Sequence, residues 1–382
     1  MRTRRRPRNG LLRRQRTDGQ SGRHPGRQIE VNGTRSARRE QTCSRSRGDR
    51  VQPRWAFCES HENSPRTGQV IDISAQPSQQ STRYRFVVPS IAASVVPHTP
   101  KAVLPYLQLA RMHAPIGSWL YLLPGLWGIA LASAGLPDWR QVLLFTVGGV
   151  LVRGFGCVVN DLADRKFDAR VARTVARPLV AGTVTVTGAL VFAVVQAVAG
   201  LLVLAVASVP AAVFVAASYP LVVAYPFMKR ITYWPQAWLG MVFGCYILAG
   251  WLAVAGRIET PALLLFVAGV FWTLGYDTIY AHQDKADDVQ VGVKSLALRL
   301  GRATRPWVAG FYGATVVGIV AAGAVADLHW TFYALFLPGV AHLAWQVVTV
   351  DIDNPADCRD KFMANRFFGW LVLVAIVAGR VL

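Results

Sequence analysis

The chain has 382 residues, 53% of them hydrophobic and 16% charged, with a formal net charge of +20. The first 100 residues contain 20 Arg, no Lys and 7 acidic residues, so most of the excess charge belongs to one end, while the remainder is strongly apolar. The five cysteines show no paired spacing, so neither a disulfide framework nor a zinc site is indicated.

Residues 1–100 are rich in Arg, Ser, Gln, Gly and Pro and contain few aromatic residues. Such a segment does not bury enough apolar surface to fold, so we expect a disordered basic tail. Arginines without interleaved aromatics are weak evidence for nucleic-acid binding, and we expect no nucleic-acid partner. The scattered acids argue against a transit peptide, and no apolar segment of a signal peptide follows the basic start. The alternatives are an anionic-lipid or nucleic-acid arm, a transit peptide, or a start site assigned too far upstream; we favour a tail without function in the mature protein.

From about residue 115, apolar stretches of roughly 17 to 22 residues recur, the length that spans a bilayer core as a helix. Nine are predicted, at about 115–134, 141–159, 186–206, 210–227, 236–256, 261–281, 306–326, 329–350 and 365–382. Lipid offers no partners for backbone groups, which leaves a helical bundle as the spanning structure. The fold class predicted for residues 101–382 is therefore an all-α, polytopic membrane protein embedded in lipid.

The basic residues beyond residue 100 sort onto alternate loops of this bundle, 18 on one side and 3 on the other. The positive-inside rule places the basic side, and with it the N-terminus, in the cytoplasm. We expect a bacterial inner membrane, because the N-terminus makes a poor transit peptide, with the mitochondrial inner membrane as the alternative.

Two blocks of acidic residues follow the second and sixth apolar stretches, on the predicted cytoplasmic side. In a helix, Asp161, Asp164 and Asp168 occupy one face. The second block repeats this spacing with Asp277 and Asp284, has Tyr280 in the middle position, and continues to Asp288. Acids at a membrane boundary usually mark a functional site, and two facing acid clusters require a cation.

Magnesium suits these acids better than calcium, since the spacing lacks the Gly turn and alternating ligands of an EF-hand. Mg²⁺ takes one or two carboxylates and completes its shell with water and substrate phosphates. Basic residues on the same side would neutralise remaining phosphate charge; these are Arg173, Lys229, Arg230 and Lys294. The residues therefore predict a diphosphate presented from the membrane.

Several segments, in order, resemble the UbiA family of membrane prenyltransferases in its 4-hydroxybenzoate polyprenyltransferase branch. They are GCVVNDLADRKFD (156–168), RTVARPL (173–179), YPFMKR (225–230), residues 276–288 and GVKS (292–295). The resemblance covers about residues 101–382 and does not extend to the first 100.

The resemblance implies transfer of a polyprenyl group from polyprenyl diphosphate to the ring of 4-hydroxybenzoate, ortho to the hydroxyl, in ubiquinone synthesis. It places Asn160, Asp161, Asp164 and Asp168 in the first magnesium and diphosphate motif, and Asp277, Tyr280, Asp284 and Asp288 in the second. It assigns substrate contacts to Arg111, Lys229 or Arg230, and Lys294. Of the tyrosines, Tyr280 is the preferred candidate for stabilising the carbocation, because it occupies the middle position of the repeated spacing.

Two alternatives stay open. One is a member of the same superfamily with another acceptor, such as a naphthoate, homogentisate, chlorophyllide or haem. The other is a cation-coupled transporter, whose ion site would lie near the bilayer midplane on broken helices. Because the acids follow the ends of apolar segments, the sequence favours the enzyme.

Overall fold

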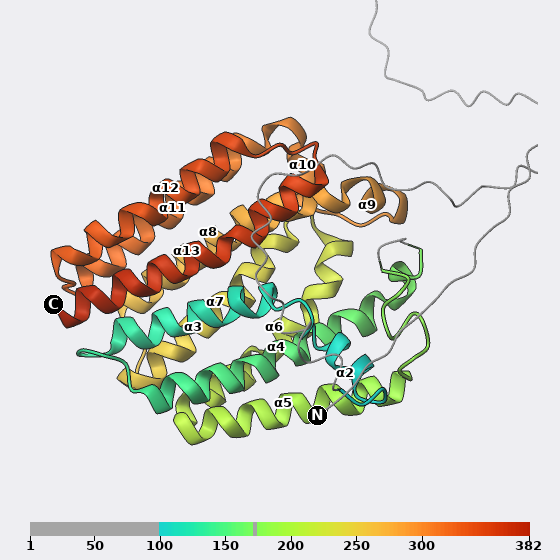
Figure 1. Ribbon diagram of the computed structural model, residues 1–382, viewed down its shortest axis with the longest axis horizontal. Coiled ribbons are helices and arrows are strands. Elements are labelled where there is room, and N and C mark those ends of the chain that lie inside the picture. Colours follow the sequence, from blue (N-terminus) through green and yellow to red (C-terminus); the bar gives the residue numbers. More distant parts are fainter. Residues whose placement is uncertain (1–98, 171–173) are drawn as a thin grey trace, which may run out of the picture. The chain divides into compact units, whose positions relative to one another are not determined.

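The computed structural model describes residues 99–170 and 174–382, which belong to one compact unit, Thr82–Leu382 (Figure 1). The predicted basic tail lies outside the described residues, apart from Thr99 and Pro100. All regular secondary structure in the described ranges is helical. The predicted fold class is confirmed for this part of the chain.

Nine long helices form the bundle in the described ranges, matching the nine predicted stretches. They are α3 (Ile116–Ala132), α4 (Trp139–Asp168), α5 (Val186–Ala207), α6 (Val209–Ile231), α7 (Pro235–Ala255), α8 (Thr260–Ala281), α11 (Thr304–Val325), α12 (Trp330–Thr349) and α13 (Pro355–Val381). Eight are long and apolar enough to cross a membrane, and α3, with 17 residues, is shorter. The chain is therefore a multi-pass membrane protein. Short helices complete the unit: α2 (Leu104–Leu109), η2 (His282–Asp284), α9 (Lys285–Val291), α10 (Leu296–Leu300) and η3 (Gly301–Ala303).

Local signals in the sequence start these helices. The side chains of Asp138, Thr185 and Ser208 cap α4, α5 and α6 by accepting a hydrogen bond from a first-turn backbone N–H. Proline occupies the first turn of α6, α7, α8 and α13, where its missing N–H has no partner to lose.

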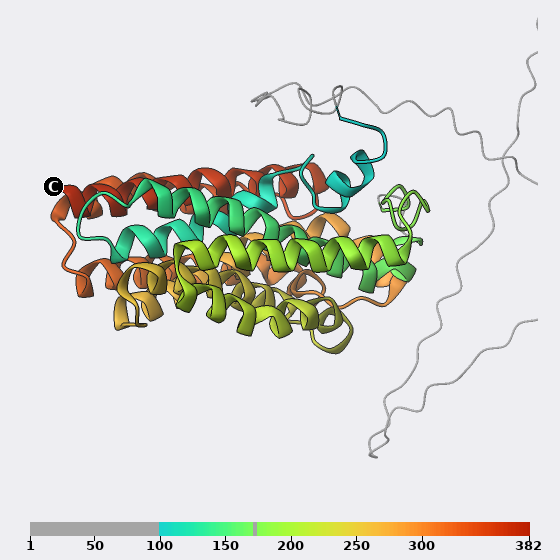
Figure 2. The same cartoon turned by 90° about the horizontal axis from the view of Figure 1, so that it is seen from below.

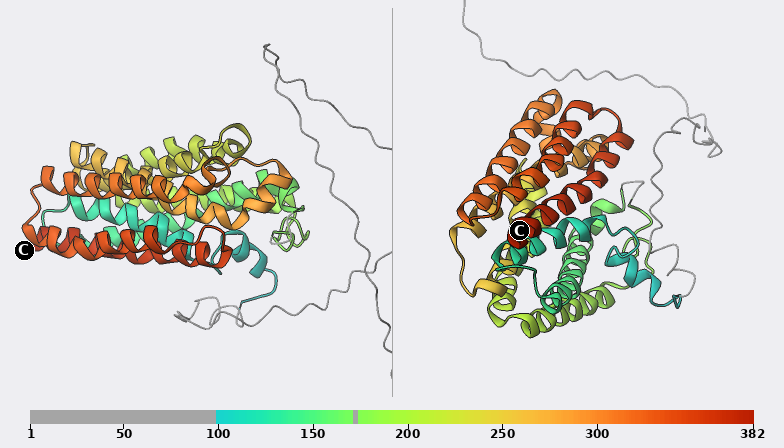
Figure 3. Two further views of the ribbon diagram at one scale, coloured as in Figure 1. Left: turned by 90° about the horizontal axis from the view of Figure 1, so that it is seen from above. Right: turned by 60° about the vertical axis from the view of Figure 1, so that its left-hand side comes forward.

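The long helices lie side by side along one direction (Figure 2 and the left panel of Figure 3). The turned view in Figure 3 separates α4 and α5 from α11 and α12. Small residues allow the closest crossings: a Cβ at Gly128 of α3 would collide with the Ile247 carbonyl of α7, and one at Gly275 of α8 with the Tyr312 ring of α11. Large side chains such as Trp127, Trp272 and Phe368 fill the centre between the helices.

Two helices extend beyond the predicted stretches by nine residues or more. Helix α4 continues past the end of the apolar stretch and through the first acid block to Asp168. The acids of this block have the spacing of one helical face, which is consistent with the longer helix. Helix α13 begins at Pro355, ten residues before the predicted start, so Asp357 and Asp360, which fall between the predicted stretches 329–350 and 365–382, are helical. The start signal was Asn354, whose side chain caps α13 by accepting from Ala356 and Asp357 backbone N–H groups.

Candidate active site

The ends of α4, α6 and α8 surround two adjoining cavities. The first, here called the acidic cavity, has a volume of about 170 Å³ and contains acids from both blocks in its wall. The second, the inner cavity, has a volume of about 330 Å³ and is bordered by α3, α4, α6, α7, α8 and α13. Asn160, Tyr225, Lys229, Asp277 and Tyr280 are among the residues that border both. Both acid blocks therefore lie at the same end of the bundle.

The first acid block lies on the last turns of α4. Because α4 is helical to its end, Asp161, Asp164 and Asp168 share one face, as predicted, and all three are buried. A buried carboxylate is stable only with compensating charge or hydrogen bonds. Ion pairs with basic residues from other segments provide this compensation.

Arginine from two loops neutralises this block. Arg111 Nη2 lies 2.6 Å from Asp161 Oδ1. Arg177 Nη1 lies 3.2 Å from the same oxygen and 2.5 Å from Asp168 Oδ2. Arg111 has a φ of 58°, a left-handed conformation uncommon for a residue with a Cβ, in the turn between α2 and α3. In the same turn, burial and the neighbouring Arg111 lower the pKa of His113.

The end of α6 approaches the first block from another side. Lys229 Nζ lies 3.4 Å and Arg230 Nη2 3.6 Å from the two oxygens of Asp164. Arg230 also donates to the Ala163 carbonyl at 2.7 Å. Lys294 joins this group, because its Nζ donates to Ile231 O at 3.1 Å and its backbone N to Lys229 O at 2.8 Å. The predicted Arg173 lies outside the described residues.

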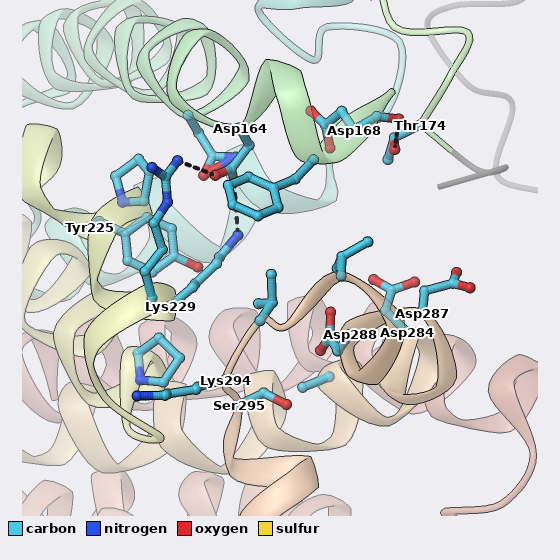
Figure 4. Close-up of a pocket in the computed structure, with 18 of the residues that line it drawn as sticks. Asp164, Asp168, Thr174, Tyr225, Lys229, Asp284, Asp287, Asp288, Lys294 and Ser295 are labelled. Carbon is cyan, nitrogen blue, oxygen red and sulfur yellow. Dashed lines mark hydrogen bonds and ion pairs between the residues drawn. The ribbon is translucent and has the colours of Figure 1, made fainter. Parts of the chain in front are cut away.

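The second acid block does not form one continuous helix. Helix α8 ends at Ala281, a 3-10 turn follows at His282–Asp284, and α9 begins at Lys285. Asp277 thus lies on α8, Asp284 in the turn and Asp288 on α9, and all three line the acidic cavity. Figure 4 shows Asp284, Asp287 and Asp288 on the side of the cavity opposite Asp164 and Asp168. The helical repeat of the first block is therefore not preserved, but the facing arrangement of the two blocks is.

The donor atoms fit a magnesium ion bound together with a diphosphate. Among the described residues, no three His, Cys, Asp or Glu side chains form a ready metal cluster. However, the buried atoms Asn160 Oδ1 and Asp161 Oδ2 have no hydrogen-bond partner, and carboxylates line the acidic cavity from both blocks. Mg²⁺ commonly needs only one or two carboxylates, since phosphate oxygens and water supply the rest of its shell.

Two arginines were absent from the predicted site. Arg177 lies in the quoted RTVARPL segment and bridges two carboxylates of the first block. Arg153 lies on α4, seven residues before Asn160 and so on the same face, and borders the inner cavity. The signal for Arg153 was a single arginine inside an apolar stretch, which is rarely placed there without a role.

Arg153 is positioned by neutral groups. Its Nε donates to Gly117 O at 3.4 Å, its Nη1 contacts Cys157 Sγ, and its guanidinium lies 5.9 Å from the Phe243 ring centroid. The ion pairs found among the described residues do not include Arg153. A cationic group that borders a cavity and has no carboxylate as an ion-pair partner is suited to bind an anionic group of a ligand.

Aromatic rings separate the acids from the core. The Tyr280 ring packs on Phe362 with centroids 4.3 Å apart, and it borders both cavities. Tyr276 is fully buried and its hydroxyl lies 3.1 Å from Thr273 Oγ1. Tyr225 lies beside Lys229, whose Nζ is 5.4 Å from its ring centroid. Tyr280 thus lies in the cavity wall, and its catalytic role remains a prediction.

Known proteins are similar to this chain in both sequence and fold. The mitochondrial 4-hydroxybenzoate polyprenyltransferase of Arabidopsis thaliana is 44% identical over 74% of this chain and 70% of its own length. The mitochondrial 4-hydroxybenzoate polyprenyltransferase of Homo sapiens is 43% identical over 76% of this chain and 79% of its own length.

Among solved structures, a UbiA homolog from Aeropyrum pernix has a TM-score of 0.57 at 22% identity, covering 68% of this chain and 96% of its own. A UbiA homolog from Archaeoglobus fulgidus, bound to GPP and Mg²⁺, has a TM-score of 0.55 at 16% identity. The match covers 71% of this chain and 99% of that homolog. Residues 121–372 match the sequence model of the UbiA prenyltransferase family. The chain belongs to the UbiA prenyltransferase family.

Proposed function

We propose that this chain transfers a polyprenyl group from polyprenyl diphosphate to the ring of 4-hydroxybenzoate, ortho to the hydroxyl, in ubiquinone synthesis. Relatives 43–47% identical carry the name 4-hydroxybenzoate polyprenyltransferase. The observation that carries the proposal is the junction of an acidic, cation-bordered cavity with an inner cavity that holds Arg153. One cavity suits a diphosphate, and the other suits an allylic chain beside an anionic aromatic acid.

The basic side chains orient the diphosphate. Arg177 and Lys229 border both cavities and pair with the first acid block, so they lie beside a diphosphate in the acidic cavity. Arg111 pairs with Asp161 from the side of the inner cavity. Bound magnesium, held by Asp161, Asp164 and Asp168 with Asp277, Asp284 and Asp288, would neutralise charge that develops on the diphosphate. The allylic C–O bond breaks, with its electron pair leaving on the diphosphate.

The inner cavity positions the acceptor. The Arg153 guanidinium would pair with the benzoate carboxylate, and the aromatic rings of Tyr121, Phe243 and Tyr276 line the same cavity beside the reacting carbons. The ring carbon next to the phenol hydroxyl forms the new C–C bond, and loss of its proton restores aromaticity. The electron-rich Tyr280 ring faces the junction where positive charge develops.

One assay tests this function and its metal site together. Membranes containing the protein are incubated with Mg²⁺, a polyprenyl diphosphate and 4-hydroxybenzoate, and the prenylated acid is quantified. Product should form, and a chelator, Asp161→Asn or Asp277→Asn should abolish it. Asp360→Asn is the control, because Asp360 is exposed on α13 away from both cavities. Product that survives chelation and both substitutions would disprove the metal site.

The same assay decides between acceptors. Homogentisate and a naphthoate replace 4-hydroxybenzoate at equal concentration, and we expect 4-hydroxybenzoate to react fastest. The transporter alternative is not supported, since the chain belongs to a family of prenyltransferases.

We also propose that residues 101–382 form the transferase and that the tail is dispensable. Removing residues 1–95 should leave prenyl transfer unchanged, and a large loss would assign the tail a role. The proposed membrane is a bacterial inner membrane, with the mitochondrial inner membrane as the alternative favoured by relatives named mitochondrial. Localisation of the full chain and the truncated chain in yeast distinguishes these, because mitochondrial import that depends on residues 1–95 would establish a transit peptide.

A further inference from the structure

One aromatic residue of the inner cavity comes from the last helix and belongs to neither acid block. Phe362, in the second turn of α13, borders the inner cavity. Its ring lies 4.3 Å from the Tyr280 centroid and 5.8 Å from that of Tyr276. Both tyrosines lie on α8, one helical turn apart. Phe362 therefore packs against the part of α8 that carries Asp277 between them.

A buried hydrogen-bond network fixes this part of α13 against α8. Asn365, one turn beyond Phe362, is fully buried and its Oδ1 accepts from Trp272 Nε1 at 2.9 Å. Its Nδ2 donates to Gln346 Oε1 of α12 at 3.0 Å. The same Gln346 oxygen accepts from Tyr312 OH of α11 at 2.9 Å. Four helices are thereby tied together one turn beyond the partly buried Phe362, which fixes the backbone from which its ring extends.

The position of Phe362 relative to the two cavities suggests its role. Asp277, Tyr280 and Asp284 border both cavities and so mark their junction, whereas Phe362 borders the inner cavity only. The allylic carbon bonded to a diphosphate in the acidic cavity would enter the inner cavity at this junction. The Phe362 ring therefore covers the inner side of Tyr280, where water would otherwise compete with the aromatic acceptor.

We propose that Phe362 is a positioning residue that holds the Tyr280 ring at the junction and excludes water from the allylic cation. This inference rests on the proposed function. The reaction that Phe362 suppresses is hydrolysis: the oxygen of water bonds to the allylic carbon, the bond to diphosphate breaks, and the proton passes to solvent, which yields polyprenol and diphosphate. Phe362 thus sets the ratio of prenyl transfer to hydrolysis.

The test measures that ratio in purified full-length protein reconstituted into lipid nanodiscs. Phe362→Leu keeps an apolar side chain but removes the ring, and we expect polyprenol per prenylated benzoate to rise about tenfold, equivalent to about 1.4 kcal/mol. Phe362→Tyr retains the ring and should restore the wild-type ratio. A ratio is used because a fall in the amount of folded protein lowers both products equally.

Two neighbours on α13 provide matched controls. Phe368→Leu removes a fully buried ring that packs on Trp127 and Trp272, so it should lower stability without changing the ratio. Phe367→Leu removes a ring that is 47% exposed, and should change neither. An unchanged ratio in Phe362→Leu, or an equal rise in Phe368→Leu, would overturn the inference.

Failure of the proposed function would appear differently, as a wild-type protein that makes no prenylated 4-hydroxybenzoate. The ratio is then measured with whichever aromatic acceptor the wild type does prenylate.

Discussion

Arg177 is the residue on which the geometry of the first acid block depends most. It bridges Asp161 and Asp168, which lie two turns apart on α4, and it borders both cavities. Arg177→Ala should lower prenyl transfer about a hundredfold, the usual scale for removing one charge-stabilising donor. Arg177→Lys should recover only part of this loss, since an ammonium lacks the planar fork that contacts two carboxylates.

The measurement is the steady-state rate of product formation at saturating and limiting polyprenyl diphosphate. Arg170→Ala is the charge-matched control, because Arg170 is exposed just beyond α4 and borders neither cavity. Full activity of Arg177→Lys would mean that charge alone, without the bridging geometry, is sufficient.

Arg153 should determine which acceptors are used. Its guanidinium has no carboxylate in the ion pairs of the described residues, so an acceptor that brings its own carboxylate gains a charged hydrogen bond. Arg153→Met should raise the KM for 4-hydroxybenzoate about ten- to a hundredfold and leave the KM for polyprenyl diphosphate unchanged. The wild type should prefer 4-hydroxybenzoate to 4-hydroxybenzaldehyde, and the variant should lose that preference. A retained preference would place the carboxylate elsewhere.

Residues of the site were predictable from the sequence to the extent that helical spacing determines their positions. Asp161, Asp164 and Asp168 occupy one face because α4 is a regular helix to its end. The partners of these acids were not predictable in the same way. Arg111 and Arg177 come from turns before α3 and after α4, and only the folded chain brings both to Asp161. Phe362 gave no signal at all, since it lies among polar residues before the predicted stretch 365–382.

Among the elements, α8 shows the limit of pattern reasoning most clearly. Its sequence repeats the acid spacing of α4, yet the α-helix stops at Ala281 and a 3-10 turn separates it from α9. His282 in this turn is buried, with Nε2 2.8 Å from Thr304 Oγ1 at the start of α11. This tertiary contact lies at the interruption of the α-helix, and no spacing of residues along α8 could reveal it.

The crossing of α3 and α7 yields a prediction about stability. A Cβ at Gly128 would collide with backbone atoms of Ile247 and Trp251, which have no rotamer through which to move away. Gly128→Ala should therefore destabilise the bundle by about 1–3 kcal/mol, as overpacking usually does. Thermal unfolding in detergent, followed by loss of monodisperse protein, measures the change.

Gly310→Ala is the matched control for this substitution. Gly310 also lies within a long helix, α11, but a Cβ added there would meet nothing within 4 Å. Alanine should stabilise this helix, by up to about 1 kcal/mol from its higher helix propensity. Equal stability of Gly128→Ala and the wild type would show that α3 and α7 shift apart without penalty.

On the scale of the whole molecule, the number and order of the long helices followed from the sequence, because hydrocarbon thickness sets the length of each apolar segment. Helix ends were less predictable: α13 begins at Pro355, where polar residues precede the apolar stretch by two to three turns. The residues that face each other across the acidic cavity depend on how nine helices pack. Packing in lipid follows from small-residue contacts spread along the chain, not from any single motif.

The orientation of the bundle in its membrane is the remaining property that charge predicts. The acidic cavity is bordered by residues of both acid blocks and by Arg177, Lys229 and Lys294, which therefore share one end of the bundle. The positive-inside rule assigns this end to the cytoplasm.

Single cysteines replacing Ala181 and Ala303, which lie exposed at this end in the turns before α5 and α11, should react with a membrane-impermeant thiol reagent only in inside-out vesicles. Cysteines replacing the exposed Ala134 and Ile258, in the turns before α4 and α8, should react only in right-side-out vesicles.

The labelling is performed in a background lacking the native cysteines and still active in prenyl transfer, so that the vesicles contain the working protein. Reaction of all four positions from one side would mean that neither α4 nor α8 crosses the membrane, and that one or all three of α5, α6 and α7 also fail to cross. The opposite pattern, with Ala181 and Ala303 outside, would place the acidic cavity on the face away from the cytoplasm. In that case 4-hydroxybenzoate and magnesium would have to reach the site from the other compartment, and external chelation in right-side-out vesicles would stop the reaction.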